Sequence, residues 1–198
     1  MSAYSKQDSR EVVGRFSQSD AFWQSFSTTV PRSPRAFLGM YLKEAVRLMR
    51  AGVLSLHHEC LETYASRSDV SEIDVRKILT ALLPECRRWE DADYLMQLFG
   101  GDDHERRAAY LLRVDTLPCR FVLFREMQKC EGQLSLHVKV CQELIKRGRT
   151  ADFNLAALLG NYFDLPNVGA TFGLRLQPYE LSRFDGSYAN FKSLIQQF

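Results

Sequence analysis

The chain has 198 residues, of which 45% are hydrophobic, and its formal net charge is +2 at pH 7. This length suits one domain, and so large an apolar share excludes a disordered chain. A charge so near zero argues against a dedicated nucleic-acid-binding protein. No apolar run approaches the roughly 18 residues of a membrane span, and the N-terminus lacks the apolar stretch of a signal peptide.

The first 32 residues read as an aromatic arm that precedes a helical domain at 33–198. Apolar side chains recur in this arm at roughly helical spacing, with little charge between them, until two prolines end the pattern. We expect Phe22 and Trp23 to anchor the arm, either in a groove of the same chain or on a partner subunit.

Apolar residues recur at helical spacing in at least seven segments of residues 33–198, and no strand pattern is evident. Residues suited to capping helix starts stand at Ser33, Ser71 and Thr150, and Gly52 is suited to a helix end. The sequence therefore predicts an all-α fold of about ten helices, elongated or bundle-like, in a single domain. The predicted core residues are Leu79, Leu82, Phe121, Phe124, Leu144, Leu158, Tyr162, Leu194 and Ile195.

The five cysteines are scattered and form no C-x-x-C pair, which favours reduced, buried thiols in the cytosol or nucleus. We therefore expect a cytoplasmic protein. His57 with Cys60, and His137 with Cys141, share helix faces, but structural zinc needs four converging ligands and the spacing does not join the two pairs. The motifs of serine hydrolases, zinc proteases and phosphate-binding loops are missing from the sequence. We therefore expect no metal, no cofactor and no enzymatic activity.

The C-terminal part of the chain carries its most specific pattern. An apolar helical run leads into Gly160, Asn161 and Tyr162, and the segment 173–176, which contains Arg175, precedes a last amphipathic helix. Local chemistry alone explains this as a helix-loop-helix corner, in which Gly160 adopts a positive φ or allows helices to approach closely.

This order of motifs resembles the formin homology-2 domain, the actin-assembly domain of formins. In that family a helix ends in Gly-Asn-Tyr-Met-Asn, a Gly-Phe-Lys-Leu segment follows, and a leucine-rich helix closes the block. The segment from Leu117 to Arg125 is similar to the family's Pro-Arg-Leu segment and Leu-Phe-Lys helix. The likeness covers about residues 72–198 and is strongest after Leu117. Two departures are a short connection between Phe124 and Gly160 and an end at the helix where formins continue.

The resemblance implies a non-enzymatic module that binds actin or regulates its assembly. Arg175 takes the place of the family's actin-contacting lysine, and the Gly-Asn-Tyr corner corresponds to the post that a partner's lasso wraps in the ring-shaped dimer of formins. The resemblance therefore also implies a homodimer, held through the aromatic arm. The predicted partner-binding residues are Phe22, Trp23, Arg120, Arg125, Gly160, Asn161, Tyr162 and Arg175.

A second hypothesis is a helical adaptor that keeps a formin-like core but no longer binds actin. Such an adaptor docks onto other protein subunits of a larger complex through exposed aromatic residues or its C-terminal helix. In this alternative Arg175 is solvated or paired with an internal carboxylate such as Asp164 or Asp185.

Overall fold

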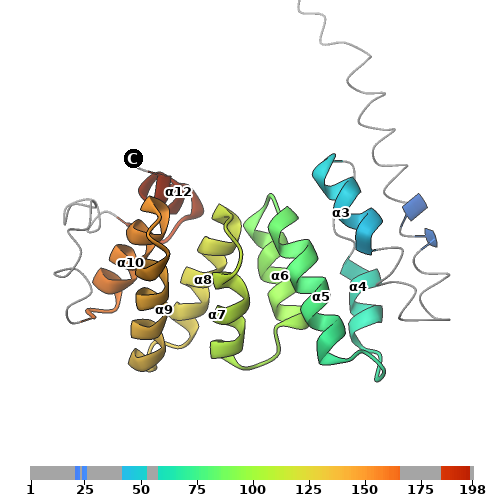
Figure 1. Ribbon diagram of the computed structural model, residues 1–198, viewed down its shortest axis with the longest axis horizontal. Coiled ribbons are helices and arrows are strands. Elements are labelled where there is room, and N and C mark those ends of the chain that lie inside the picture. The colour runs from blue at the N-terminus through green and yellow to red at the C-terminus, as the bar shows by residue number, and fades with distance from the viewer. Residues whose placement is uncertain (1–20, 23, 26–41, 53–57, 166–183, 197–198) are drawn as a thin grey trace, which may run out of the picture. The chain divides into compact units, whose positions relative to one another are not determined.

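The computed structural model describes residues 21–22, 24–25, 42–52, 58–165 and 184–196. These residues form nine α-helices with defined bounds and one 3₁₀ helix, and they contain no strand (Figure 1). The predicted all-α fold is thus confirmed for the described part of the chain. None of the helices in this part is both long and apolar enough to cross a bilayer.

The described part of the chain divides into two compact units. The first takes in the described residues up to Arg87 and the C-terminal part of helix α6 (Trp89–Phe99), and the second takes in the start of α6 and the described residues from Gly100 onward. The expected boundary between an arm and a domain at residue 32 stays a prediction, because the chain on both sides of it lies outside the described residues.

The first unit is built from three α-helices and a 3₁₀ turn, besides its share of α6. Their bounds are Leu42–Arg50 for α3, His58–Ala65 for α4, Glu72–Leu82 for α5 and Leu83–Glu85 for η2. Helix α3 packs against both α5 and η2. Side chains of this unit with no exposed surface include Leu61, Tyr64, Ile78, Leu79, Leu95 and Met96.

The start of α5 and the end of α3 follow the sequence prediction. The Ser71 hydroxyl accepts a hydrogen bond from the Asp74 amide at 3.3 Å, and the Asp74 carboxylate accepts one from the Ser71 amide at 3.1 Å, which completes a capping box. Gly52 has a φ of 71° just after α3, in the left-handed region that favours glycine. The predicted cap at Ser33 lies outside the described residues.

The second unit contains five α-helices besides its share of α6. Their bounds are His104–Leu112 for α7, Leu117–Lys129 for α8, Leu134–Arg147 for α9, Thr150–Tyr162 for α10 and Tyr188–Gln196 for α12. Helix α8 packs against α7, α10 and α12, while α9 packs against α7 and α10 (Figure 1). Because α8 and α10 each have neighbours on several sides, most of their residues are buried.

The core of the second unit centres on aromatic residues of α8. The rings of Phe121 and Phe124 lie 5.0 and 5.9 Å from the ring of Phe191 on α12, centre to centre. The buried amide of Asn154 on α10 donates to the carbonyl of Ile195 at 3.2 Å, so a hydrogen bond also joins α10 to the end of α12. Aromatic packing and this bond together hold α12 on the other helices.

The predicted core is confirmed at eight of its nine positions, and the exception is Tyr162. The eight confirmed residues, all 5% exposed or less, are Leu79, Leu82, Phe121, Phe124, Leu144, Leu158, Leu194 and Ile195. The prediction for Tyr162 is wrong, since its side chain is 48% exposed. Tyr162 is the last residue of α10, where the helix has passed the neighbours that cover its earlier turns.

The predicted cap at Thr150 is also wrong. Thr150 is the first residue within α10, and the N-cap residue is Arg149, whose side chain makes no capping hydrogen bond. Asp152 in the first turn supplies a negative charge near the helix start instead, which the helix dipole favours.

We predict that Leu158→Ala lowers the free energy of unfolding by about 2–5 kcal/mol, because the side chain is 1% exposed and its removal leaves a cavity. Urea unfolding measures the change. Leu134→Ala is the matched control, since Leu134 is 54% exposed and its loss is expected to change stability by less than about 0.5 kcal/mol. Similar losses for the two variants would contradict the packing of α10.

Candidate functional site

Helix α10 ends in a tightly hydrogen-bonded corner just after the Gly-Asn-Tyr sequence. The Leu165 amide donates to the Gly160 carbonyl at 2.8 Å, and the Asp164 amide donates to the Asn161 carbonyl at 3.3 Å. This is the hydrogen-bond pattern of a Schellman motif, in which one residue adopts a left-handed conformation. Asp164 takes that conformation, with a φ of 49°, so the first of the two roles considered for Gly160, a positive φ, is wrong. Gly160 is a buried helical residue, and the other role, close approach of helices, stays a prediction.

Tyr162 stands half-exposed on this corner and is held by residues of α8. Its ring meets the ring of Phe124 edge to face, with centres 5.3 Å apart, and its hydroxyl accepts a hydrogen bond from the Gln128 amide at 3.0 Å. The next residue, Phe163, meets the Tyr162 ring at 4.9 Å. The aromatic side chain therefore has a fixed orientation while 48% of it faces solvent.

The corner rests on a buried histidine of α9. The ring of Phe163 stacks on that of His137, with centres 4.1 Å apart and planes 12° from parallel. His137 donates from Nε2 to the carbonyl of Met127 at 2.9 Å, and the Cys130 sulfur lies 3.8 Å from the same nitrogen. His137 thus serves to join α9 to the end of α8 and to the corner.

The site residues that sequence reasoning missed are Gln128, His137 and Phe163. Phe124 and Gln128 lie four residues apart on α8, so helical spacing places them on one face, where both reach Tyr162. That spacing was a usable signal. The stacking of His137 on Phe163 joins residues 26 positions apart and leaves no local pattern in the sequence.

Arg120 lies inside the fold and not on its surface. It is 9% exposed, and its guanidinium donates to the Asp152 carboxylate at 2.7 Å and also pairs with Asp115. Asp152 has no exposed surface. Asp115 is partly exposed and also forms an ion pair with Arg149, which faces solvent. An arginine engaged in this way holds α8 to the start of α10 and has little surface to offer a partner.

We predict that Arg120→Ala lowers the free energy of unfolding by about 3–5 kcal/mol, because it leaves the buried Asp152 carboxylate without a countercharge. Urea unfolding measures the change, and Lys192→Ala, at an exposed position of α12, is the control that should leave stability unchanged. A loss below about 1 kcal/mol would mean that water solvates the carboxylate.

Arg125, the other basic candidate on α8, is half-buried. Its guanidinium lies over the ring of Trp89, 4.7 Å from the ring centre, and Trp89 in turn contacts Phe121 edge to face at 5.2 Å. Such a cation–π contact leaves some of the guanidinium open to solvent. Arg120 and Arg125 are therefore each engaged with other residues, Arg120 with two carboxylates and Arg125 with a tryptophan ring.

Three further predicted partner-binding residues, Phe22, Trp23 and Arg175, lie within or next to parts of the chain that the structure does not describe. Phe22 is 8% exposed, so it is already buried within its own chain, as expected for an arm anchored in cis. Trp23 and Arg175 lie outside the described residues. Of the eight predicted residues, the structure brings together Gly160, Asn161 and Tyr162 on the α10 corner, where Asn161 is exposed beside Tyr162.

A second buried charge, Glu126 on α8, is neutralised by basic groups of the same unit. The carboxylate has no exposed surface and accepts a hydrogen bond from Nδ1 of His104 at 2.6 Å. Arg107 lies 3.4 Å away, and Lys129 lies 3.3 Å away and reaches Asp93 at 3.7 Å.

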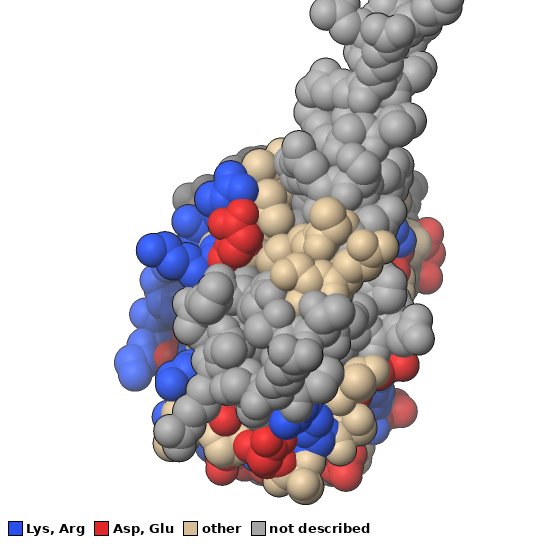
Figure 2. Space-filling model, turned by 90° about the vertical axis from the view of Figure 1, so that its right-hand side faces the viewer, with Lys and Arg blue, Asp and Glu red and all other residues tan. Residues whose placement is uncertain are grey.

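Lys and Arg side chains also gather on the surface, along the left edge of the face shown in Figure 2, which is the side of the molecule where α3, α4 and α5 lie in Figure 1.

Four cysteines are buried and take no part in a disulfide, namely Cys86, Cys119, Cys130 and Cys141. Burial raises the pKa of the Cys119 thiol to about 11 and that of the Cys141 thiol to about 12. Both thiols are therefore protonated at neutral pH and are poor nucleophiles, as expected of cysteines that pack in a core.

We predict that Cys119 and Cys141 stay unmodified when the folded protein is treated with iodoacetamide at pH 8, because raised pKa values keep them as thiols and burial blocks access. Peptide mass mapping measures the labelling. The same protein in urea is the control and should be labelled at both positions. Labelling of folded Cys141 as fast as in urea would contradict its burial.

Comparisons of the chain with protein-family models, with curated proteins and with solved structures find no match.

Proposed function

We propose that this chain is a non-enzymatic helical module that binds actin, similar to a truncated formin homology-2 domain. The observation that carries the proposal is the half-exposed Tyr162 at the end of α10, in the Gly-Asn-Tyr sequence that carries the resemblance. In this proposal the corner itself contacts actin, whereas in formins the corresponding post meets the lasso of a partner subunit. In this proposal the module acts by binding actin through its surface, without covalent chemistry.

The α10 corner has the physical properties of a binding surface. Tyrosine combines a large apolar ring with a polar hydroxyl and is enriched where proteins contact each other. Phe124, Phe163 and Gln128 already fix the orientation of Tyr162, so little side-chain entropy is lost on binding. Exposed Asn161 adds an amide donor and acceptor beside the ring.

The basic part of the proposed contact is Arg175. Actin is acidic, so an exposed basic residue on this chain would speed association and add to affinity. Arg120 does not belong to the proposed contact, because Asp152 and Asp115 already occupy its guanidinium. Arg125 can take part in the contact only with the part of its guanidinium that the Trp89 ring leaves exposed to solvent.

We predict that Tyr162→Ala weakens actin binding by about tenfold, since loss of a central aromatic contact costs more than about 1 kcal/mol at an interface. Actin cosedimentation at low and raised salt measures the affinity. Leu134→Ala is the matched control, because Leu134 is an apolar residue of the same unit that is 54% exposed. Asn161→Ala, which removes an exposed side chain and no core contact, is a second test of the corner should Tyr162→Ala be unstable.

Unchanged affinity of the Tyr162 and Asn161 variants would contradict the role of the corner. Arg175→Ala then tests the resemblance by itself, with an expected loss of about 1–3 kcal/mol in binding for a charged hydrogen bond. A fall in thermal stability without a change in actin binding would assign Arg175 to an internal ion pair.

The second candidate function is a helical adaptor that contacts other protein subunits and not actin. The internal position of Arg120 favours it, because that pairing removes one of the basic residues expected to face actin. A parent protein that shows no actin binding at low salt would leave the adaptor as the proposal. The homodimer implied by the resemblance is a separate prediction, and the burial of Phe22 within its own chain does not favour it.

A further inference from the structure

A groove between helices α7 and α9 of the second unit has an apolar floor. It has a volume of about 260 Å³ and is lined by residues of α7, α9 and the position after α7, with none from α8 or α10. Its apolar lining residues are Ala108, Ala109, Leu112, Leu136 and Val140. The alanines of α7 leave space opposite the larger side chains of α9, and Ala109 is exposed.

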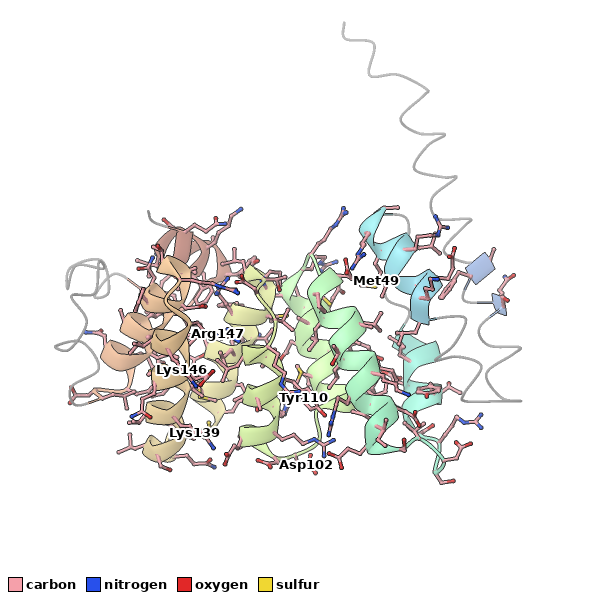
Figure 3. All side chains as sticks on the ribbon, in the orientation of Figure 1. Met49, Asp102, Tyr110, Lys139, Lys146 and Arg147 are labelled. Carbon is pink, nitrogen blue, oxygen red and sulfur yellow. The ribbon has the colours of Figure 1, made fainter. Side chains whose placement is uncertain are left out.

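The two helices that form the groove run in the same direction. Glu105 in the first turn of α7 pairs with Lys139 in the N-terminal half of α9, and both line the groove. Arg113, just after α7, and Arg147, the last residue of α9, line it as well. Figure 3 shows Lys139 toward one end of α9 and Arg147 toward the other.

Charge along the groove is balanced at one end and positive at the other. Lys139 neutralises Glu105, and Lys146 lies 3.9 Å from Glu143, the other acidic lining residue. Arg113 and Arg147 have no ion-pair partner among the residues that the structure describes. An occupant of the groove therefore meets an apolar floor and two unneutralised guanidinium groups.

We propose that this groove binds an acidic amphipathic α-helix of a partner protein. An apolar stripe at helical spacing fills the hollow above the alanines of α7, as helices pack by ridges into grooves. Carboxylates beside that stripe pair with Arg113 and Arg147, whose planar guanidinium groups suit carboxylate geometry. This surface shares no residue with the α10 corner, so the proposal does not depend on actin binding.

The probe is a synthetic peptide of about 14 residues, near the length of α9, with leucines along one helical face and glutamates beside them. The control peptide keeps the leucines and replaces each glutamate by lysine. Fluorescence anisotropy of labelled peptides with the full chain measures binding, and we expect the glutamate peptide to bind more tightly and to weaken with added salt. Equal binding of the two peptides, or binding of neither, overturns the proposal.

Variants of the full chain locate the contact. Arg113→Glu and Arg147→Glu should each weaken the glutamate peptide by about fivefold or more, because each replaces attraction by repulsion. Lys192→Glu, the same change of charge on α12, is the matched control and should alter binding by less than about twofold. No difference between these variants and the control overturns the proposal.

Leu112→Asp tests the apolar floor and should abolish peptide binding while circular dichroism remains unchanged, since Leu112 is only partly buried. Light scattering of the parent and of this variant tests whether a second copy of the chain, and not a partner helix, fills the groove. A parent dimer that Leu112→Asp converts to a monomer would mean that a second copy of the chain fills the groove, which overturns the partner proposed.

Discussion

Helix α8 is buried on most sides and yet carries two charged side chains in its interior, Arg120 and Glu126. A buried charge is tolerated only when countercharges and hydrogen bonds replace the water it has lost. Asp152 at the start of α10 forms an ion pair with Arg120. On α7, Arg107 forms an ion pair with Glu126 and His104 donates a hydrogen bond to it. These pairs fix where α7 and α10 stand along α8, because any shift would leave a charge without its partner. The aromatic cluster around Phe124 and the docking of α12 depend on that placement.

The same helix determines the character of the α10 corner. Phe124 lies at the centre of the core on one side and against the ring of Tyr162 on the other, and Gln128, one turn later, holds the tyrosine hydroxyl. Tyr162 is therefore rigid without being buried. A rigid, half-exposed aromatic residue costs little entropy to bind. The α7–α9 groove differs in kind, since its floor is aliphatic and its two unneutralised arginines favour a carboxylate-bearing partner.

Helix content was predictable because apolar spacing and capping residues are local signals. The capping box at Ser71 and the glycine after α3 are examples, since each depends on residues within a few positions. The groove also has a local signal in the sequence, because Glu105 and Ala109 of α7 and Arg113 just after it recur at intervals of four and so lie on one side. The left-handed residue at the corner was not predictable in the same way, since Asp164 takes the conformation that the sequence had offered as one of two roles for Gly160.

The sequence by itself determined that the described chain is helical, where several helices begin and end, and which apolar residues face a core. It did so because 3.6-residue periodicity and caps act over one or two turns. Only the tertiary structure decided which polar residues are internal and which are free to bind. Arg120 and Arg125 look alike in the sequence, but one is paired with a carboxylate 32 positions away and the other lies over a tryptophan from α6. Exposure depends on neighbours distant in the chain, so helical periodicity cannot report it.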